Sequence, residues 1–341
     1  MSTSDEETPV SPPSVNATAI EAAQLRDIVP TAQIGARSAF GLNDWWSTND
    51  YHRLASGGYS RDVDCDAGTI GDLAVAGVSL RGHKHTLDGK ANEDAFALRV
   101  ATTSDGDRYL VVVVCDGLSS AAHSSFAARR TSSLVADLLG RFVADPRFSL
   151  RRLKDNLERY LAKEVKPLLR TWESTPWDTP QWGAPSSSPL ETDPKDLHVT
   201  LTFALVPAAV GVAGGSEAII GAIGDSPCFL LHGGQWRRLG IHDPTDGGVL
   251  STRTNAFPTS TAPEYAQLVL RAGDALCVAS DGVGNFVEKD GQVLALGTYL
   301  AAQWSSPVDI PTFIRDASFD LRSADDDRTV VMCWLQRERP N

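Results

Sequence analysis

The sequence predicts an α+β fold, a four-layer αββα sandwich of two antiparallel sheets flanked by helix pairs. Strand-like and helical segments are grouped along the chain: strands, two helices, many strands, two helices and a last strand. Such grouping favours α+β over alternating βαβ units. Several strand-like runs are apolar throughout, which is typical of strands covered on both faces. Two sheets packed face to face, with helices outside, would bury both kinds of segment.

The expected strands are short apolar or alternating runs bounded by turn residues. They are residues 73–80, 95–100, 109–115, 198–206, 217–223, 228–232, 235–239, 268–272, 275–280 and 329–336. Asp105-Gly106, Gly233-Gly234 and Gly273-Asp274 are the turn signals between neighbouring strands. The run from residue 217 to residue 239 is expected to form a three-stranded meander.

Helical spacing of apolar residues predicts the helices. They are expected at residues 119–144, 149–172, 291–304 and 308–321. Residues 174–196 and 242–263 are rich in polar residues and Pro, and they are predicted to be surface loops.

The chain divides into three parts by composition. Residues 1–30 are rich in Ser, Thr, Pro and Glu, which predicts a disordered tail. Residues 31–70 hold several Trp and Tyr among Gly, Ser and Asp, and are predicted to be an arm without an assigned role. Residues 71–337 show no internal linker, so we expect them to form one domain.

Charge and cysteine content limit the partners and the compartment. A formal net charge of −12 argues against a nucleic-acid binder. No apolar run reaches the ~18 residues of a membrane span, and the acidic N-terminus does not resemble a signal peptide. The five cysteines are dispersed without a CxxC pair, and most lie in strand-like runs, as small buried hydrophobes do. We therefore expect a cytoplasmic protein with no membrane or nucleic-acid partner.

Three of the apolar runs end in an acid beside a glycine. These acids are Asp116, Asp225 and Asp281, and Glu93-Asp94 and Asp325-Asp326-Asp327 also adjoin expected strands. An isolated Asp-Gly pair usually marks a turn, and a run of Asp is usually a solvated loop. Acids at the ends of several buried strands, however, are costly unless cations or donors meet them. The combination predicts a carboxylate site for a hard cation such as Mg²⁺ or Mn²⁺.

Five short motifs, in this order along the chain, resemble the metal-dependent Ser/Thr protein phosphatases (PPM, type 2C) of bacterial type. They are Asn92-Glu93-Asp94-Ala95, Asp116-Gly117, Gly224-Asp225-Ser226, Ser280-Asp281-Gly282 and Asp326-Asp327-Arg328-Thr329. The resemblance covers about residues 71–337. It implies the αββα sandwich and the hydrolysis of phosphoserine and phosphothreonine in substrates of a Ser/Thr kinase. Water bridging two Mn²⁺ or Mg²⁺ ions would attack phosphorus directly.

The resemblance also implies the metal ligands. Asp116 would bridge both ions, and the Gly117 carbonyl and Glu93 would bind one of them. Asp281 and Asp326 would hold the other.

Further roles follow from the same resemblance. Asp94 would take part in catalysis by orienting groups bound to the metals, and Asp225 would lie near a third, weaker metal. The family often has an acid for that third ion where this chain has Asn285, so we expect a weakened third site.

The phosphate-binding Arg of the family is replaced here by Gly89. Lys90 is the nearest cation in the sequence, and His85, Lys84 and Arg81 are the other candidates. A lysine can hold phosphate as a point charge.

Two other departures concern the loop after Asp116-Gly117. Ser119-Ser120 replaces a pair of glycines, and Leu118 stands where some members have a histidine, with His123 as a candidate substitute. These departures keep a second function open, a catalytically weak or inactive regulatory module that binds phosphoproteins. A third alternative is an unrelated α+β protein with chance Asp-Gly turns.

Overall fold

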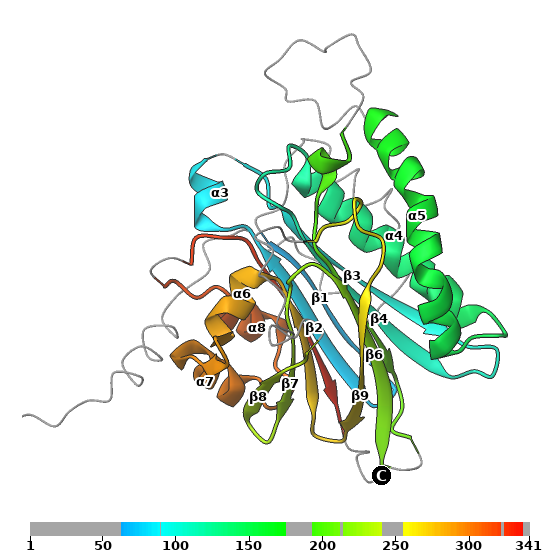
Figure 1. The fold of residues 1–341 in the computed structure, drawn as a ribbon. Coiled ribbons are helices and arrows are strands. Elements are labelled where there is room, and N and C mark those ends of the chain that lie inside the picture. The colour runs from blue at the N-terminus through cyan, green and yellow to red at the C-terminus, as the bar shows by residue number, and fades with distance from the viewer. Residues whose placement is uncertain are drawn as a thin grey trace, which may run out of the picture.

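The computed structural model describes residues 63–88, 90–174, 193–211, 214–240, 255–321 and 324–336, and its strands form two large antiparallel sheets (Figure 1). The six-stranded sheet has, in spatial order, β1 (Val63–Ile70), β2 (Leu73–Leu80), β13 (Arg328–Leu335), β10 (Ala275–Ala279), β7 (Cys228–His232) and β8 (Gln235–Arg238). The five-stranded sheet has β3 (Asp94–Thr102), β4 (Arg108–Asp116), β5 (Leu201–Pro207), β6 (Gly215–Ile223) and β9 (Glu264–Arg271).

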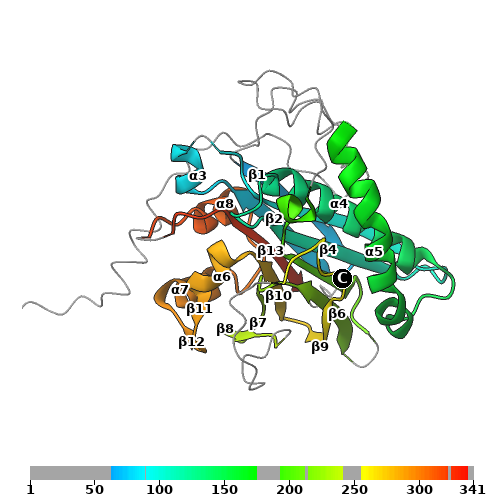
Figure 2. The same cartoon turned by 45° about the horizontal axis from the view of Figure 1, so that its top comes forward.

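Helices cover the outer face of each sheet (Figure 2). On the five-stranded sheet lie α4 (Ser124–Ala144) and α5 (Leu150–Ser174). On the six-stranded sheet lie α6 (Asp281–Val287), α7 (Ala295–Gln303) and α8 (Ile310–Ala317). Shorter elements are α3 (His83–Leu87), the turn η2 (Pro194–Leu197) and the hairpin of β11 (Glu288–Lys289) and β12 (Gln292–Val293).

The apolar core has three layers, one between the sheets and one under each set of helices. Between the sheets, Leu73 of β2 and Leu276 of β10 pack with Leu98 of β3 and Leu110 of β4. Strands of both sheets are therefore covered on both faces, as their unbroken apolar runs predict. The predicted αββα sandwich is confirmed, with α6 as a third helix beside the expected pair α7 and α8.

The sheet begins earlier in the chain than the sequence predicts. β1 pairs with β2 along its whole length, from Val63↔Leu80 to Ile70↔Leu73. Residues 63–70, assigned above to the arm, thus belong to the six-stranded sheet. The rest of the predicted arm and the whole predicted tail lie outside the described residues.

The predicted three-stranded meander is wrong. β6 belongs to the five-stranded sheet, whereas β7 and β8 form a hairpin in the six-stranded sheet. The chain passes from one sheet to the other across residues 224–227, where Gly224 has φ +106°. β6 and β7 are both apolar on two faces, so their pattern carries no information about which sheet each joins.

Helix boundaries differ from the prediction mainly near the strand ends. α4 begins at Ser124, five residues later than expected, and α6 begins directly at Asp281 in a stretch with no predicted helix. The expected helix at 291–304 is shorter, because its first residues form β12. Much of the predicted loops 174–196 and 242–263 lies outside the described residues.

All five cysteines are buried, as expected of small apolar side chains. Among the described helices, none is both long and apolar enough to cross a membrane.

Two glycines predict opposite effects of an added methyl group. A Cβ on Gly221 of β6 would lie 2.1 Å from the ring of Phe203, its buried cross-strand partner. We expect Gly221→Ala to lower the free energy of unfolding by about 1–3 kcal/mol, because the core has no room for it. Gly140→Ala in α4 meets no atom within 4 Å and should raise stability by about 0.5–1 kcal/mol. Urea midpoints of the two variants test this; equal midpoints would contradict it.

Candidate active site

The predicted acidic residues gather where strand ends of both sheets meet. β3 begins at Asp94 beside the end of β4 at Asp116, because these two residues are register partners. In the other sheet, β10 ends just before Ser280-Asp281, and the Ser280 amide donates to the Thr329 carbonyl of β13 at 2.8 Å. Each sheet therefore delivers acids from one pair of antiparallel strands to the same end of the sandwich.

A hydrogen bond and mutual electrostatic effects join the two groups of acids across the sheets. The Asp281 amide, at the start of α6, points to Oδ2 of Asp116 at 3.4 Å. The Ser280 hydroxyl of the other sheet lowers the pKa of Asp94. The Asp116, Asp281 and Asp94 side chains thus face one another from two sheets.

The glycine of two Asp-Gly motifs is explained by close backbone approach. A Cβ on Gly117 would lie 2.5 Å from the Glu93 carbonyl oxygen, to which the Gly117 amide donates at 3.0 Å. A Cβ on Gly282 would lie 1.9 Å from the Asp327 carbonyl oxygen. Neither glycine has a positive φ, so these motifs bring segments together rather than make left-handed turns.

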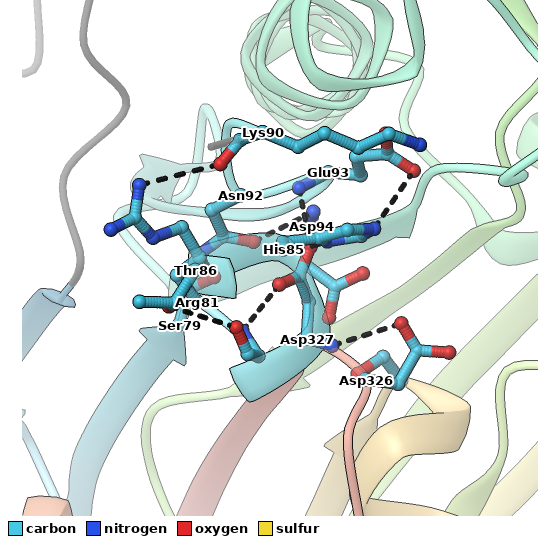
Figure 3. Close-up of polar contacts among 12 residues, drawn as sticks. Ser79, Arg81, His85, Thr86, Lys90, Asn92, Glu93, Asp94, Asp326 and Asp327 are labelled. Carbon is cyan, nitrogen blue, oxygen red and sulfur yellow. Dashed lines mark hydrogen bonds and ion pairs between the residues drawn. The ribbon is translucent and has the colours of Figure 1, made fainter. Parts of the chain in front are cut away.

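Asp327 is buried and connects three parts of the site (Figure 3). Its Oδ1 accepts from the Gly82 amide at 2.5 Å, and its Oδ2 accepts from the Glu93 amide at 2.5 Å. His85 Nδ1 lies 2.8 Å from the same Oδ2. Asp326, its neighbour, is exposed and accepts from the Asp327 amide at 3.0 Å.

The carboxylates repel one another. Burial raises the pKa of Asp94 well above its usual value, and the nearby charges of Asp327, Asp326 and Asp281 raise it further. Burial likewise raises the pKa of Asp116, with Asp94 as the next cause. The pKa of Asp281 is raised by burial and then by Asp326 and Asp225. A cation would relieve this repulsion.

Two carboxylate oxygens here are buried without a hydrogen bond among the described residues, Oδ2 of Asp94 and Oε2 of Glu93. Burial raises the pKa of Glu93, opposed by the charges of His85 and Lys90 and by the Ser124 hydroxyl. Unpartnered carboxylate oxygens are the donor type that hard divalent cations take, so the donor set fits Mg²⁺ or Mn²⁺. Within the described ranges, however, no three His, Cys, Asp or Glu residues form a cluster that could hold a metal ion.

The sequence profile of the family described as protein phosphatase 2C matches residues 81–310 of this chain, which is well over half of it. The chain belongs to the protein phosphatase 2C family. The matched range includes the motifs from Glu93 to Asp281.

Solved structures of protein phosphatases are also similar to this chain. The serine/threonine phosphatase of S. agalactiae is 14% identical with a TM-score of 0.48, and the alignment covers 77% of this chain and 100% of that one. Stp1 from Staphylococcus aureus is 14% identical with a TM-score of 0.44 (79% and 98% covered). The catalytic domain of PstP, in complex with two manganese ions, is 18% identical with a TM-score of 0.43 (78% and 99%). No curated protein matches the chain.

In this member of the family, Asp225 and Asn285, the two residues expected at a third metal site, lie at the edge of the acidic site. Asp225 is exposed, and its charge raises the pKa of Asp281. Asn285 is also exposed and reaches Asp281 Oδ2 with its amide nitrogen at 3.5 Å, one helical turn further along α6.

Among the expected phosphate-binding residues, His85 does not fit. Its side chain is 3% exposed, and its two ring nitrogens face Asp327 and Glu93, so it has no free face for phosphate. Lys90 is exposed, and its side chain runs over Glu93 in Figure 3. Arg81 Nη1 donates to the Lys90 carbonyl at 3.3 Å, while Gly89 lies outside the described residues.

His123, the candidate substitute for the histidine missing at Leu118, lies at the start of α4 beside η2. The His123 amide donates to the Asp196 carbonyl at 2.8 Å. Burial lowers the pKa of the His123 imidazole, and the charge of Asp196 raises it.

Sequence reasoning missed several polar residues that hold the acids in place. Ser124 lowers the pKa of Glu93, and Ser280 lowers the pKa of Asp94. Asn92 accepts from the Asp94 amide at 2.9 Å and donates to Ser79 at 2.9 Å. Ser280 and Asn92 directly adjoin predicted acids, and that adjacency was the available signal.

The raised pKa values predict how the metal-free protein responds to pH. An acid whose pKa is higher in the folded than in the unfolded chain stabilises the fold below its unfolded value, near 4, and this contribution is lost as pH rises through the folded value. Asp94→Asn removes one such group. We expect the variant to have a higher Tm than the wild type at pH 7.5 in EDTA, and a similar Tm at pH 4.5.

The matched control is Asp105→Asn, which removes an exposed acid from the turn between β3 and β4. It should leave the Tm difference near zero at both pH values. If Asp94→Asn lowered the Tm at pH 7.5, the repulsion described above would not be the dominant force on Asp94.

Proposed function

We propose that this chain is a metal-dependent protein serine/threonine phosphatase that hydrolyses phosphoserine and phosphothreonine in proteins. The observation that carries the proposal is the meeting of Asp94, Asp116 and Asp281 from two sheets with raised pKa values and an unpartnered buried oxygen on Asp94. Such a set of acids disfavours its own ionisation, and divalent cations would reverse that. Membership of the protein phosphatase 2C family supports the reaction class.

The resemblance to the family implies which residues would hold two ions. Glu93 and the Gly117 carbonyl would bind one ion, Asp281 and Asp326 the other, and Asp116 both. When bound, two Mn²⁺ or Mg²⁺ ions lower the pKa of water and stabilise the charge of an in-line displacement at phosphorus. Asp225 and Asn285 at the edge of the site would contribute to a third, weaker position.

The chain's own groups would do the remaining work. The exposed Lys90 ammonium, on the side of Glu93, would attract and place the substrate phosphate as a point charge. The Asp94 amide donates to Asn92, and Ser280 lowers the pKa of the Asp94 carboxyl. The buried Oδ2 of Asp94 would orient water near the ions.

The partner would be a protein phosphorylated by a Ser/Thr kinase. We therefore propose that the phosphatase acts in a signalling pathway. The five cysteines are buried and dispersed along the sequence without a CxxC pair, which supports a reducing compartment, so we propose a cytoplasmic location.

Activity with a small phosphomonoester tests the reaction class. We expect Mn²⁺-dependent hydrolysis of p-nitrophenyl phosphate, with kcat lowered at least about 100-fold in Asp116→Asn, because the variant loses the carboxylate shared by both ions. Asp155→Asn, which removes an exposed acid from α5, should keep wild-type kcat.

If the wild type shows no hydrolysis at millimolar Mn²⁺, the reaction class is wrong for this chain. The regulatory, phosphoprotein-binding alternative would then be the better account.

The role of Lys90 can be separated from that of the metal site. Lys90→Ala should raise the KM for phosphopeptide about 3- to 10-fold with a smaller change in kcat, because an exposed charge contributes about 1 kcal/mol to binding. Lys154→Ala on α5 is the control. An unchanged KM in Lys90→Ala would assign phosphate binding to another cation of the rim, such as Arg81 or Lys84.

A further inference from the structure

His85 is a buried histidine whose ring lies between two acidic side chains, and the proposed reaction does not use it. It belongs to α3, a helix of five residues, yet it is 2% exposed. Its Nδ1 lies 2.8 Å from Asp327 Oδ2, and its Nε2 lies 3.7 Å from Glu93 Oε2 (Figure 3). Packing a short helix with an imidazole between two acids costs more free energy than packing it with an apolar side chain, because the apolar side chain would fill the space without burying polar atoms.

The hydrogen-bond partners fix the proton on one ring nitrogen. Both oxygens of Asp327 accept backbone amides, from Gly82 and from Glu93. Asp327 therefore acts as an acceptor toward His85, so Nδ1 carries the hydrogen and donates it. At 3.7 Å the second nitrogen does not make a hydrogen bond with Glu93.

The Asp327 carboxylate then determines where Glu93 lies. The Asp327 carboxylate accepts a hydrogen bond from the Glu93 amide, and the Glu93 carbonyl accepts one from the Gly117 amide at 3.0 Å. The side chain of Glu93 ends in an oxygen without a hydrogen bond. A rotation of the Asp327 carboxylate would break its hydrogen bond with the Glu93 amide and let the Glu93 side chain shift.

We propose that His85 is a positioning residue for the divalent cation: through its Nδ1–H it fixes the Asp327 carboxylate, which holds the Glu93 backbone so that the Glu93 side chain faces the metal. This deepens the proposed function and rests on it. The other charged groups facing His85 and Glu93 are Lys90 over Glu93 and Asp94 beside Asp327, and neither replaces the Nδ1 donor.

Two amide variants separate the two ring nitrogens. The side-chain nitrogen of Asn lies two bonds from Cβ, as Nδ1 of His does, whereas that of Gln lies three bonds away, as Nε2 does. Both variants are polar and of similar size, so neither creates a large cavity. His83→Asn is the matched control, because His83 is exposed on the same helix.

The measurement is Mn²⁺ binding to the metal-free, full-length protein by titration calorimetry, with Mg²⁺ as a second ion. We expect His85→Gln to bind Mn²⁺ about 10- to 100-fold more weakly, the usual loss when a residue behind a metal ligand is removed. His85→Asn should stay within about threefold of the wild type, and His83→Asn should be unchanged. The Tm of each metal-free variant, recorded in EDTA, reports any purely structural loss.

Equal Mn²⁺ affinity in the Gln and Asn variants, whether retained or lost, would overturn the proposal. A lower metal-free Tm with wild-type affinity in His85→Gln would also overturn it, because His85 would then only attach α3. A wild type that binds neither ion defeats the proposed function itself, whereas a wild type that binds Mn²⁺ and hydrolyses phosphate, with no loss in His85→Gln, defeats only this inference.

Discussion

Repulsion among carboxylates is the constraint that the rest of this molecule accommodates. Asp94, Asp116 and Asp281 come from different strand ends, and each has its pKa raised by burial and by acidic neighbours. Without a bound cation, the protein would lower its electrostatic free energy if these carboxylates moved apart. The sandwich prevents this, because register within each sheet and apolar packing between the sheets fix the strand ends. The stability of the core thus maintains an unfavourable arrangement of charge that suits a cation.

Much of the fold could be predicted because its strands are apolar on both faces. The unbroken run at 109–115 gave β4 within one residue at each end, and residues 73–80 gave β2 with the same bounds. The partition of strands between sheets could not be predicted, because β6 and β7 are equally buried and adjacent in sequence. The helix α6 was missed because it is seven residues long and begins within an Asp-Gly motif that usually signals a turn.

At the site, residue types predicted which acids gather but not which of them are buried. In the run Asp325-Asp326-Asp327, Asp326 is exposed and Asp327 is buried under three donors, a distinction that depends on the loop at 82–93 brought in from the other end of the chain. His85 was predicted to hold phosphate because it is a basic residue near the position of the missing Arg, and the sequence carries no signal of its burial. The contact that encloses it joins residues 242 positions apart.

The place of β13 in the six-stranded sheet has a consequence for biosynthesis. This strand lies between β2 and β10, so without it the sheet would separate into β1–β2 on one side and β10–β7–β8 on the other. The residues that precede it, Asp326 and Asp327, complete the acidic end of the sandwich. A nascent chain that has not yet extended past Arg328 therefore carries two half-sheets that nothing joins, and its acidic site is incomplete until β13 pairs with both of them.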